Sequence, residues 1–405
     1  MNHLTTDLAQ ALVENRDIKE IFREHLEHAL NQLLRNELTC FLDYEPYDAK
    51  GINSGNSRNG YYSRKFNTEF GELSIQVPRD RNGSFEQQTV APYKRNSDSL
   101  EEVVIHLYKK GVTTSEIADL MEKMYGHHYS KQTISNFTKM VEADIEAYKS
   151  SPLNKRYVCV YLDATHIPLR RKTVAKEAVY IAIGIDEDGH KEVLDFTIAP
   201  TESAMVWEEL IQGLKARGLE NVLLFISDGL SGMTDAIHRV YPYAKHQTCL
   251  VHIARNINGK ARVSDREEIA DDFKKIHQAT NLESAQEALK AFEKKWRPSY
   301  KKLVDNLVQN NQLLVFLDFP ECIQRSLYST NLIEGFNAQI KRYTKRKEQF
   351  PNEESLERFL VSIFLDYNQK FAMRCHRGFK KAKPEIIEMF EEQLAKQQST
   401  PSLTV

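Results

Sequence analysis

Three acidic residues stand where separate elements of the chain could bring them together. Asp163 ends an alternating, strand-like run that begins at Arg156, and Asp228 follows the wholly apolar run 222–227. A carboxylate at the end of a strand projects from the sheet edge, beside the equivalent residue of a neighbouring strand. Glu334 lies much later, within an amphipathic helical pattern. We expect these three side chains to meet at one point.

Three clustered carboxylates predict a divalent metal site. Hard oxygen ligands suit Mg²⁺ or Mn²⁺, and two such ions about 4 Å apart can assist an in-line displacement at phosphorus. Without cations, the like charges would repel and raise one another's pKa. We therefore predict two Mg²⁺ or Mn²⁺ ions per active site, held by Asp163, Asp228 and Glu334 as catalytic metal ligands. The alternative for each acid taken singly is a solvated strand end or helix face.

The elements around these acids predict a mixed sheet. In chain order they are strands 156–163, 178–185 and 192–198, helix 202–217, strand 222–227, a helix to Val240, and a strand turning into a helix at 246–252. Three hairpin-linked strands followed by helix, buried strand, helix and strand is the RNase H order. The predicted fold class is α/β, an RNase H-like catalytic domain with a mixed five-stranded sheet flanked by helices. Residues 259–325 are helical and highly charged, without a clear strand.

The N-terminal part is predicted to be largely helical and to bind DNA. Residues 6–43 form one amphipathic helix, followed by a Gly- and Asn-rich loop at 51–60 and a hairpin of strands 61–66 and 73–77. From residue 100 to 148 the pattern is helical, with breaks at Gly111 and Gly126 and a capping box from Thr113 to Glu116.

Two short helices joined near Gly126 resemble a helix-turn-helix, in which Ser130 caps the second helix. In that interpretation the residues facing a major groove are Lys131, Gln132, Ser135 and Asn136. An ordinary helical hairpin is the alternative.

Two basic patches are candidate contacts to the DNA backbone, although the net charge of the 405 residues is −2. The first comprises Arg58, Arg64, Lys65, Arg79 and Arg81, with tyrosines between them. The second follows Glu334 and comprises Lys341, Arg342, Lys345, Arg346 and Lys347. The alternative for each patch is a solvated surface.

The overall composition favours a cytoplasmic protein with a sizeable core. Hydrophobic residues make up 41% of the chain, the mean hydropathy is −0.53, and no apolar run approaches the roughly 20 residues that span a bilayer. The first residues lack the pattern of a secretion signal. Five scattered cysteines suit reduced thiols better than a disulfide framework. We expect a cytoplasmic, nucleoid-associated protein without a membrane partner.

Four sequence blocks resemble the signatures of one family. They are Tyr161–His166, Ser227–Gly232, Cys249–Asn256 and Thr330–Asn337, and they occur in order at fitting spacings. The chain resembles the mutator-type transposases of bacterial insertion sequences. The resemblance implies an RNase H-like fold with an all-α insertion between the second Asp and the Glu, at about 259–325, and it implies Asp163, Asp228 and Glu334 as catalytic metal ligands.

The resemblance also implies the reaction and its partners. The protein would bind double-stranded DNA, namely terminal inverted repeats and target DNA, and would catalyse metal-dependent strand cleavage and strand transfer. Pairing two DNA ends calls for at least a homodimer, with helix 6–43 as a candidate interface. Two alternatives remain: a non-catalytic helix-turn-helix regulator, and a nuclease on the same fold that does not join strands.

A cysteine, two histidines and a tryptophan are further candidates for a role at the site. Cys249 and His252 form a Cys-x-x-His motif, for which zinc is the less favoured reading because no second ligand pair lies nearby. We expect Cys249 to pack and His252 to support the carboxylates or contact a DNA phosphate. His166 is a second phosphate candidate, although a local hydrogen bond is the favoured role. Trp296 resembles a base-stacking tryptophan of related transposases, but core packing is favoured.

The predicted organisation has four regions. They are a DNA-binding and dimerisation region at 1–95, a helix-turn-helix-like region at 96–150, the catalytic domain with its insertion at 151–345, and a helical C-terminal region at 346–405.

Overall fold

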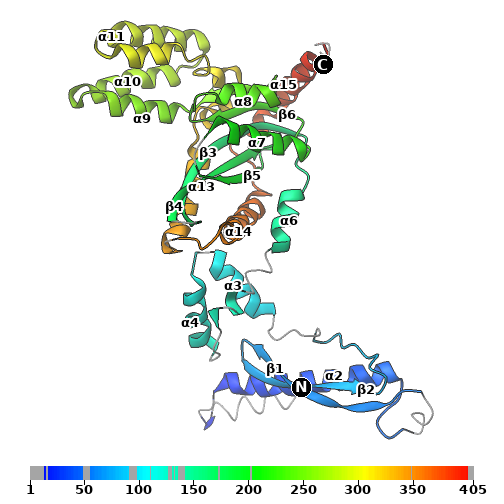
Figure 1. Ribbon diagram of the computed structural model, residues 1–405. Coiled ribbons are helices and arrows are strands. Elements are labelled where there is room, and N and C mark those ends of the chain that lie inside the picture. Colours follow the sequence, from blue (N-terminus) through cyan, green and yellow to red (C-terminus); the bar gives the residue numbers. More distant parts are fainter. Residues whose placement is uncertain are drawn as a thin grey trace. The chain divides into compact units, whose positions relative to one another are not determined.

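The chain forms two compact units, Met1–Met140 and Val141–Val405 (Figure 1). The structure is a computed structural model, and it describes residues 13–14, 17–48, 55–90, 98–109, 111–125, 130–131, 133–135, 142–171, 174–200, 203–347 and 349–399. The expected boundaries at 95/96 and 345/346 fall inside these units. No helix in the described part of the chain is long and apolar enough to cross a membrane.

The elements of the first unit are α2 (Ile18–Leu42), β1 (Arg58–Thr68), β2 (Gly71–Asp80), α3 (Asp98–Lys109) and α4 (Thr114–Tyr125). Helix α2 begins at Ile18 because the Asp17 side chain accepts a hydrogen bond from the backbone N–H of Lys19. The expected start at residue 6 lies outside the described residues.

The predicted hairpin is confirmed, with longer strands. β1 and β2 pair antiparallel from Thr68 opposite Gly71 to Arg58 opposite Asp80. One face of this hairpin buries Leu73, Ile75 and Val77 against Leu34 of α2. A helix lying on a two-stranded sheet gives the unit its apolar core.

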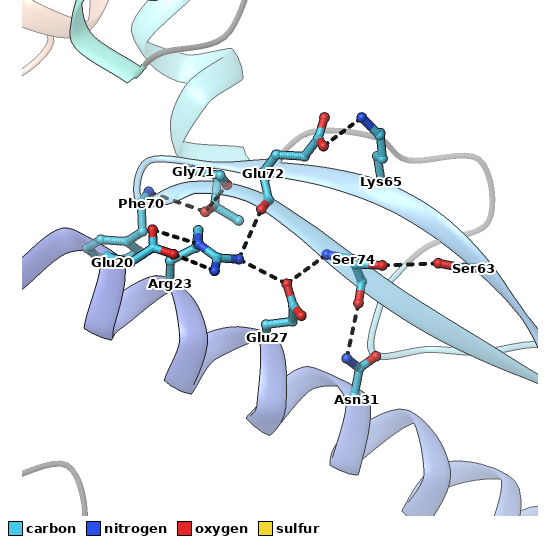
Figure 2. A network of polar contacts seen from close by, with 11 residues as sticks. Glu20, Arg23, Glu27, Asn31, Ser63, Lys65, Phe70, Gly71, Glu72 and Ser74 are labelled. Carbon is cyan, nitrogen blue, oxygen red and sulfur yellow. Dashed lines mark hydrogen bonds and ion pairs between the residues drawn. The ribbon is translucent and has the colours of Figure 1, made fainter. Parts of the chain in front are cut away.

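Polar side chains of α2 also cover the backbone edge of β2 (Figure 2). Arg23 donates to the Glu72 carbonyl at 3.4 Å, and Glu27 accepts from the Ser74 N–H at 2.9 Å. Asn31 donates to the Ser74 carbonyl at 3.1 Å and accepts from the Gln76 N–H at 2.7 Å. Residues four apart lie on one side of a helix, so this row follows the strand and satisfies an edge that could otherwise pair with another chain.

The capping box that precedes α4 is confirmed. The Thr113 hydroxyl accepts from the Glu116 N–H at 3.2 Å, while the Glu116 carboxylate accepts from the Thr113 N–H at 2.9 Å. Ser130 caps as expected by accepting from the Thr133 N–H at 3.1 Å. Gln132, Asn136 and most of the second helix lie outside the described residues, so the helix-turn-helix stays a prediction.

The second unit holds a five-stranded mixed sheet, as predicted. Its strands are β3 (Arg156–Arg170), β4 (Val174–Ile185), β5 (Lys191–Ala199), β6 (Asn221–Ser227) and β7 (Lys245–Thr248), arranged in the order β5-β4-β3-β6-β7. β3, β4 and β5 pair antiparallel, whereas β6 and β7 extend the sheet in parallel. Every residue of β6 is buried, as its apolar sequence predicts for a central strand.

Helices cover both faces of this sheet. They are α6 (Glu142–Ser150), α7 (Ala204–Ala216), α8 (Met233–Val240), α13 (Asn331–Thr344), α14 (Glu353–Phe371) and α15 (Phe379–Ser399). Helix α9 (Leu250–Lys260), which follows β7, instead packs beside the helical segment that comes after it (Figure 1). α7 and α8 pack on one face, where Trp207 and Ile237 join the main core. On the other face Phe364 of α14 contacts Phe196 of β5 and Phe336 of α13. Helix α14, which belongs to the predicted C-terminal region at 346–405, therefore packs against the sheet.

The segment between α9 and α13 is helical, as predicted. It contains α10 (Arg266–His277), α11 (Leu282–Val308), α12 (Glu321–Leu327) and the short 3₁₀ turns Val263–Asp265 and Val315–Asp318. Ile269, Phe273 and Phe292 are buried within it. No strand occurs among the described residues of this segment.

Candidate active site

Asp163 and Asp228 lie side by side on neighbouring strands. β3 and β6 pair in parallel, with Tyr161 opposite Ile226, and continuing that register by two residues sets Asp163 beside Asp228. The expectation that the strand ends at Asp163 is wrong, because β3 continues to Arg170 by pairing with β4. What ends near Asp163 is the pairing with β6, so the two acids still meet where β6 stops.

The Asp163 carboxylate is held by two hydrogen bonds. Its Oδ2 accepts a hydrogen bond from Asn337 Nδ2 at 2.8 Å, and its Oδ1 accepts one from the backbone N–H of Ala164 at 2.9 Å. Burial raises the pKa of Asp163 to about 6; the Asn337 hydrogen bond opposes this, and the charge of Asp228 adds to it. Asp163 is therefore a carboxylate whose ionised form calls for positive charge nearby.

Glu334 is oriented by two basic residues of α9, Arg255 and His252. Arg255 donates to both Glu334 oxygens, at 2.7 and 2.9 Å, in a bidentate pair. His252 Nε2 lies 3.4 Å from Glu334 Oε1. The first turn of α13 carries Glu334, while Ile333 and other residues of its apolar stripe are buried, as predicted.

Cys249 and His252 belong to a small polar cluster beside these acids. Cys249 is fully buried, and its sulfur accepts from the Thr330 N–H at 3.3 Å and from the Thr330 hydroxyl at 3.1 Å. Hydrogen bonds from His252 and Thr330 outweigh burial and lower the pKa of Cys249. The hydrogen bond with Cys249 and the charges of Glu334 and Asp163 raise the pKa of His252. Cys249 is thus packed in the interior and His252 lies beside Glu334, while the roles predicted for both in the reaction stay predictions.

The donor chemistry fits divalent cations, although a complete ligand set is not assembled in this conformation. Among the described residues, no group of three or more His, Cys, Asp or Glu side chains is arranged to hold a metal ion. Asp163 and Asp228 present neighbouring carboxylates, and Glu334 is paired with Arg255 instead. The predicted Mg²⁺ or Mn²⁺ site stays a prediction that requires Glu334 to exchange partners.

Trp296 lies in the core of the helical segment, as the favoured interpretation expected. Its side chain is 6% exposed, its Nε1 donates to Asp272 at 3.0 Å, and it lies near Phe292 and Tyr300. Base stacking would require the ring to leave this packing. His166 is exposed on β3, opposite Ala178.

Some of the candidate DNA-contacting residues are free to reach DNA, whereas others are engaged within the protein. Exposed side chains belong to Lys131, Lys341, Arg342 and Lys345, and Ser135 is half-buried. The side chain of Arg346 lies outside the described residues. In the hairpin, Lys65 pairs with Glu72 at 2.8 Å, and Arg64 is half-buried. Arg58 donates to the Tyr44 carbonyl and to Thr39 Oγ1, which gives it a structural role.

Sequence reasoning missed two residues of the site, Arg255 and Asn337. Both lie inside the sequence blocks that had been singled out, and Asn337 follows Glu334 by one helical turn. The helical spacing alone could have indicated that Asn337 shares a side of α13 with Glu334.

Comparisons with known proteins agree on one family. The family model described as "Transposase, Mutator family" matches residues 1–373. A transposase for insertion sequence element IS1201 from Lactobacillus helveticus is 53% identical over 91% of this chain and 100% of its own length. A transposase for insertion sequence element IS905 from Lactococcus lactis subsp. lactis is 47% identical over 96% of this chain and 100% of its own. A transposase for IS256 in transposon Tn4001 from Staphylococcus aureus is 29% identical over 91% of this chain and 95% of its own. The chain belongs to the Mutator family of transposases.

Proposed function

We propose that this transposase cleaves DNA at the ends of an insertion sequence and joins the freed 3′ ends to a second phosphodiester. The proposed active site is formed by Asp163, Asp228 and Glu334 on an RNase H-like domain. A homodimer would pair the two terminal inverted repeats, and target DNA would be the second partner.

The observation that carries the proposal is the convergence of residues that are remote in sequence. Asp163 is close enough to Asp228 for the two charges to repel each other. It also accepts a hydrogen bond from Asn337, which lies on the helix that carries Glu334. His252 interacts with both Asp163 and Glu334. A folding core alone would not gather two carboxylates, an amide and a histidine around the half-buried Asp163, and groups with such perturbed pKa values cluster at functional sites.

Asp163, Asp228 and Glu334 would hold Mg²⁺ or Mn²⁺, in line with the preference of these ions for oxygen ligands. When bound, two such ions activate the attacking oxygen and stabilise the leaving oxygen of the phosphodiester. Positive charge there would also offset the burial that raises the pKa of Asp163 to about 6. Glu334 would first separate from Arg255, whose guanidinium is well suited to donate its hydrogen bonds to a phosphate oxygen instead.

The remaining residues of the chain would bind and orient the DNA. Lys341 and Arg342 extend along the same helix as Glu334 and are exposed, so they would contact the backbone close to the cleaved bond. His252, with its raised pKa, would favour a proton and add positive charge beside the carboxylates. The sequence-specific part of the binding is assigned to the N-terminal unit.

The test uses the full chain with oligonucleotides that carry the terminal repeats of its own element. Purified protein with Mg²⁺ or Mn²⁺ should nick the element's end and yield a joined product. Asp228→Asn should abolish both steps. Asp235→Asn, which alters an exposed acid in the first turn of α8, is the matched control and should leave both steps intact.

The two alternatives give different products in the same assay. A regulator would bind the repeats without cutting them, and a nuclease would cut without joining. Either outcome, with folded protein and the correct repeats, would replace the proposal.

A further inference from the structure

Asn337 is a buried amide that contacts one proposed catalytic acid, Asp163, and lies on the helix that carries another, Glu334. It is 5% exposed, and its Nδ2 donates to Asp163 Oδ2 at 2.8 Å. It lies on α13, three residues after Glu334, so the two side chains share one side of the helix. One turn of α13 therefore carries both Glu334 and the residue that contacts Asp163 of β3.

The orientation of the Asn337 amide follows from chemistry. An ionised carboxylate only accepts hydrogen bonds, so the NH₂ group must face Asp163, and the reversed amide would set two oxygens against each other. In this orientation Asn337 Oδ1 is buried without a hydrogen-bond partner in the described part of the structure. A buried polar atom left without a partner is costly, so packing alone does not account for this residue.

The hydrogen bond leaves the carboxylate able to bind further groups. Asn337 and the Ala164 N–H each use one lone-pair site of Asp163, one on each oxygen. A carboxylate offers about four such sites, so two stay available while the rotamer is fixed. Buried Ile333, Phe336 and Ile340 hold α13 against the sheet face on which Asp163 lies.

We propose that Asn337 is a positioning residue that orients Asp163 and fixes the distance between β3 and the helix carrying Glu334. The inference rests on the proposed function for its catalytic meaning, but the orientation of Asp163 can be measured independently. Residues that hold a metal ligand from behind in this way affect metal affinity and activity by about 10- to 100-fold.

The experiment compares Asn337→Leu, which keeps the approximate volume and removes the donor, with Gln339→Leu on the same helix. Gln339 lies two residues away and donates to the Tyr343 hydroxyl, not to an acid. Asn337→Leu should bind terminal-repeat DNA with unchanged affinity. It should bind Mn²⁺, measured by calorimetry, about 10-fold more weakly, and its single-turnover cleavage should fall by about 10- to 100-fold. Gln339→Leu should match the parent in all three measurements.

A second variant guards against misfolding. Asn337→Asp is isosteric, but it replaces the donor with a carboxylate facing Asp163, so cleavage should again fall although an oxygen ligand has been added. Cleavage within twofold of the parent in Asn337→Leu, or equal losses in Gln339→Leu, would overturn the inference.

Crystal structures separate this inference from the proposed function. In Asn337→Leu the Asp163 side chain should rotate away from its present rotamer. An unchanged rotamer would disprove the positioning role even if cleavage is lost. A changed rotamer in a chain whose parent cannot cut DNA would leave the positioning role intact and reject the proposed function.

Discussion

The edge of β2 and the candidate active site are both polar, but they use polar groups in opposite ways. Along β2, Arg23, Glu27 and Asn31 each hydrogen-bond to a backbone group (Figure 2). In the site, Asn337 Oδ1 is buried and has no hydrogen-bond partner among the described residues, and the pKa of Asp163 is raised.

The difference distinguishes polar groups that stabilise the fold from polar groups that are available to bind a ligand. A network in which the backbone groups all have partners stabilises one arrangement of the chain. A network with unpaired polar groups is held in place by the surrounding core, and its unpaired groups can still bind a ligand. Four measurements test whether this distinction holds.

The largest effect is expected at Glu334. Glu334→Gln keeps the side-chain volume but removes the charge, so strand cleavage should fall by about 1000-fold, as expected for a group that stabilises the transition state. Single-turnover cleavage of terminal-repeat DNA measures it. Glu321→Gln, in the first turn of α12, is the control and should cleave normally. Comparable activity in both variants would remove Glu334 from the site.

The next effect tests a satisfied network that lies next to the site. His246 is buried, and its ring nitrogens lie 2.9 Å from the hydroxyls of Ser227 and Thr234. Burial, aided by the charge of His238, lowers the pKa of His246 to about 4, below the 6.5 of an unperturbed histidine. As the pH falls, the unfolded chain takes up this proton first. The contribution of neutral His246 to the free energy of unfolding is therefore fully present above pH 6.5. It is lost as the pH falls from 6.5 to 4, and the loss amounts to about 3 kcal/mol.

Urea unfolding at pH 7.0 and pH 4.5 measures this loss. His246→Asn should lose less stability between the two values than the parent, whereas His166→Asn, at an exposed position of the same sheet, should behave like the parent. Identical pH dependence in all three proteins would show that His246 is not the responsible group.

A smaller effect is expected at the edge of β2. Asn31→Leu removes two hydrogen bonds to β2 and should lower the free energy of unfolding of the first unit by about 2 kcal/mol. Urea titration followed by circular dichroism checks this. Asn36→Leu, at an exposed position of α2, should change stability far less. Equal losses would mean that the edge contacts have no specific role.

The smallest effect sharpens the comparison inside the site. Arg255→Gln should leave the fold intact and tighten Mn²⁺ binding without DNA by up to about 5-fold, because Glu334 no longer has an exposed ion-pair partner to exchange. Arg255→Lys, which keeps the charge, should lie close to the parent. Weaker Mn²⁺ binding in Arg255→Gln would show that Arg255 assists the cation site instead of competing with it.

The sequence predicted elements whose signals are local. The hairpin, the capping box at Thr113 and the buried strand β6 follow from side-chain periodicity and cap chemistry. The position of Asp163 within its strand was not predictable in this way, because β3 is prolonged by pairing with β4 and not by its own residues.

The sequence indicated the three acids as candidates, but it did not indicate the residues that they contact. Arg255 and Glu334 are 79 residues apart, and Asp163 and Asn337 are 174 apart. Such contacts depend on how α13 packs against β3 and on where α9 lies relative to α13, and no local pattern encodes either arrangement. Trp296 shows the same limit, because its helical stripe suits a core or a ligand equally until burial decides.

The helical segment between α9 and α13 buries its own aromatic residues, including Phe273 and Phe292. Helices α10 and α11 therefore stabilise each other, and an exposed turn between them, such as the one at residues 279–281, could accept an inserted fluorescent reporter. The interval between Glu334 and Asn337 has no such freedom. Adding one residue there would turn the helix by about 100° and aim the amide elsewhere.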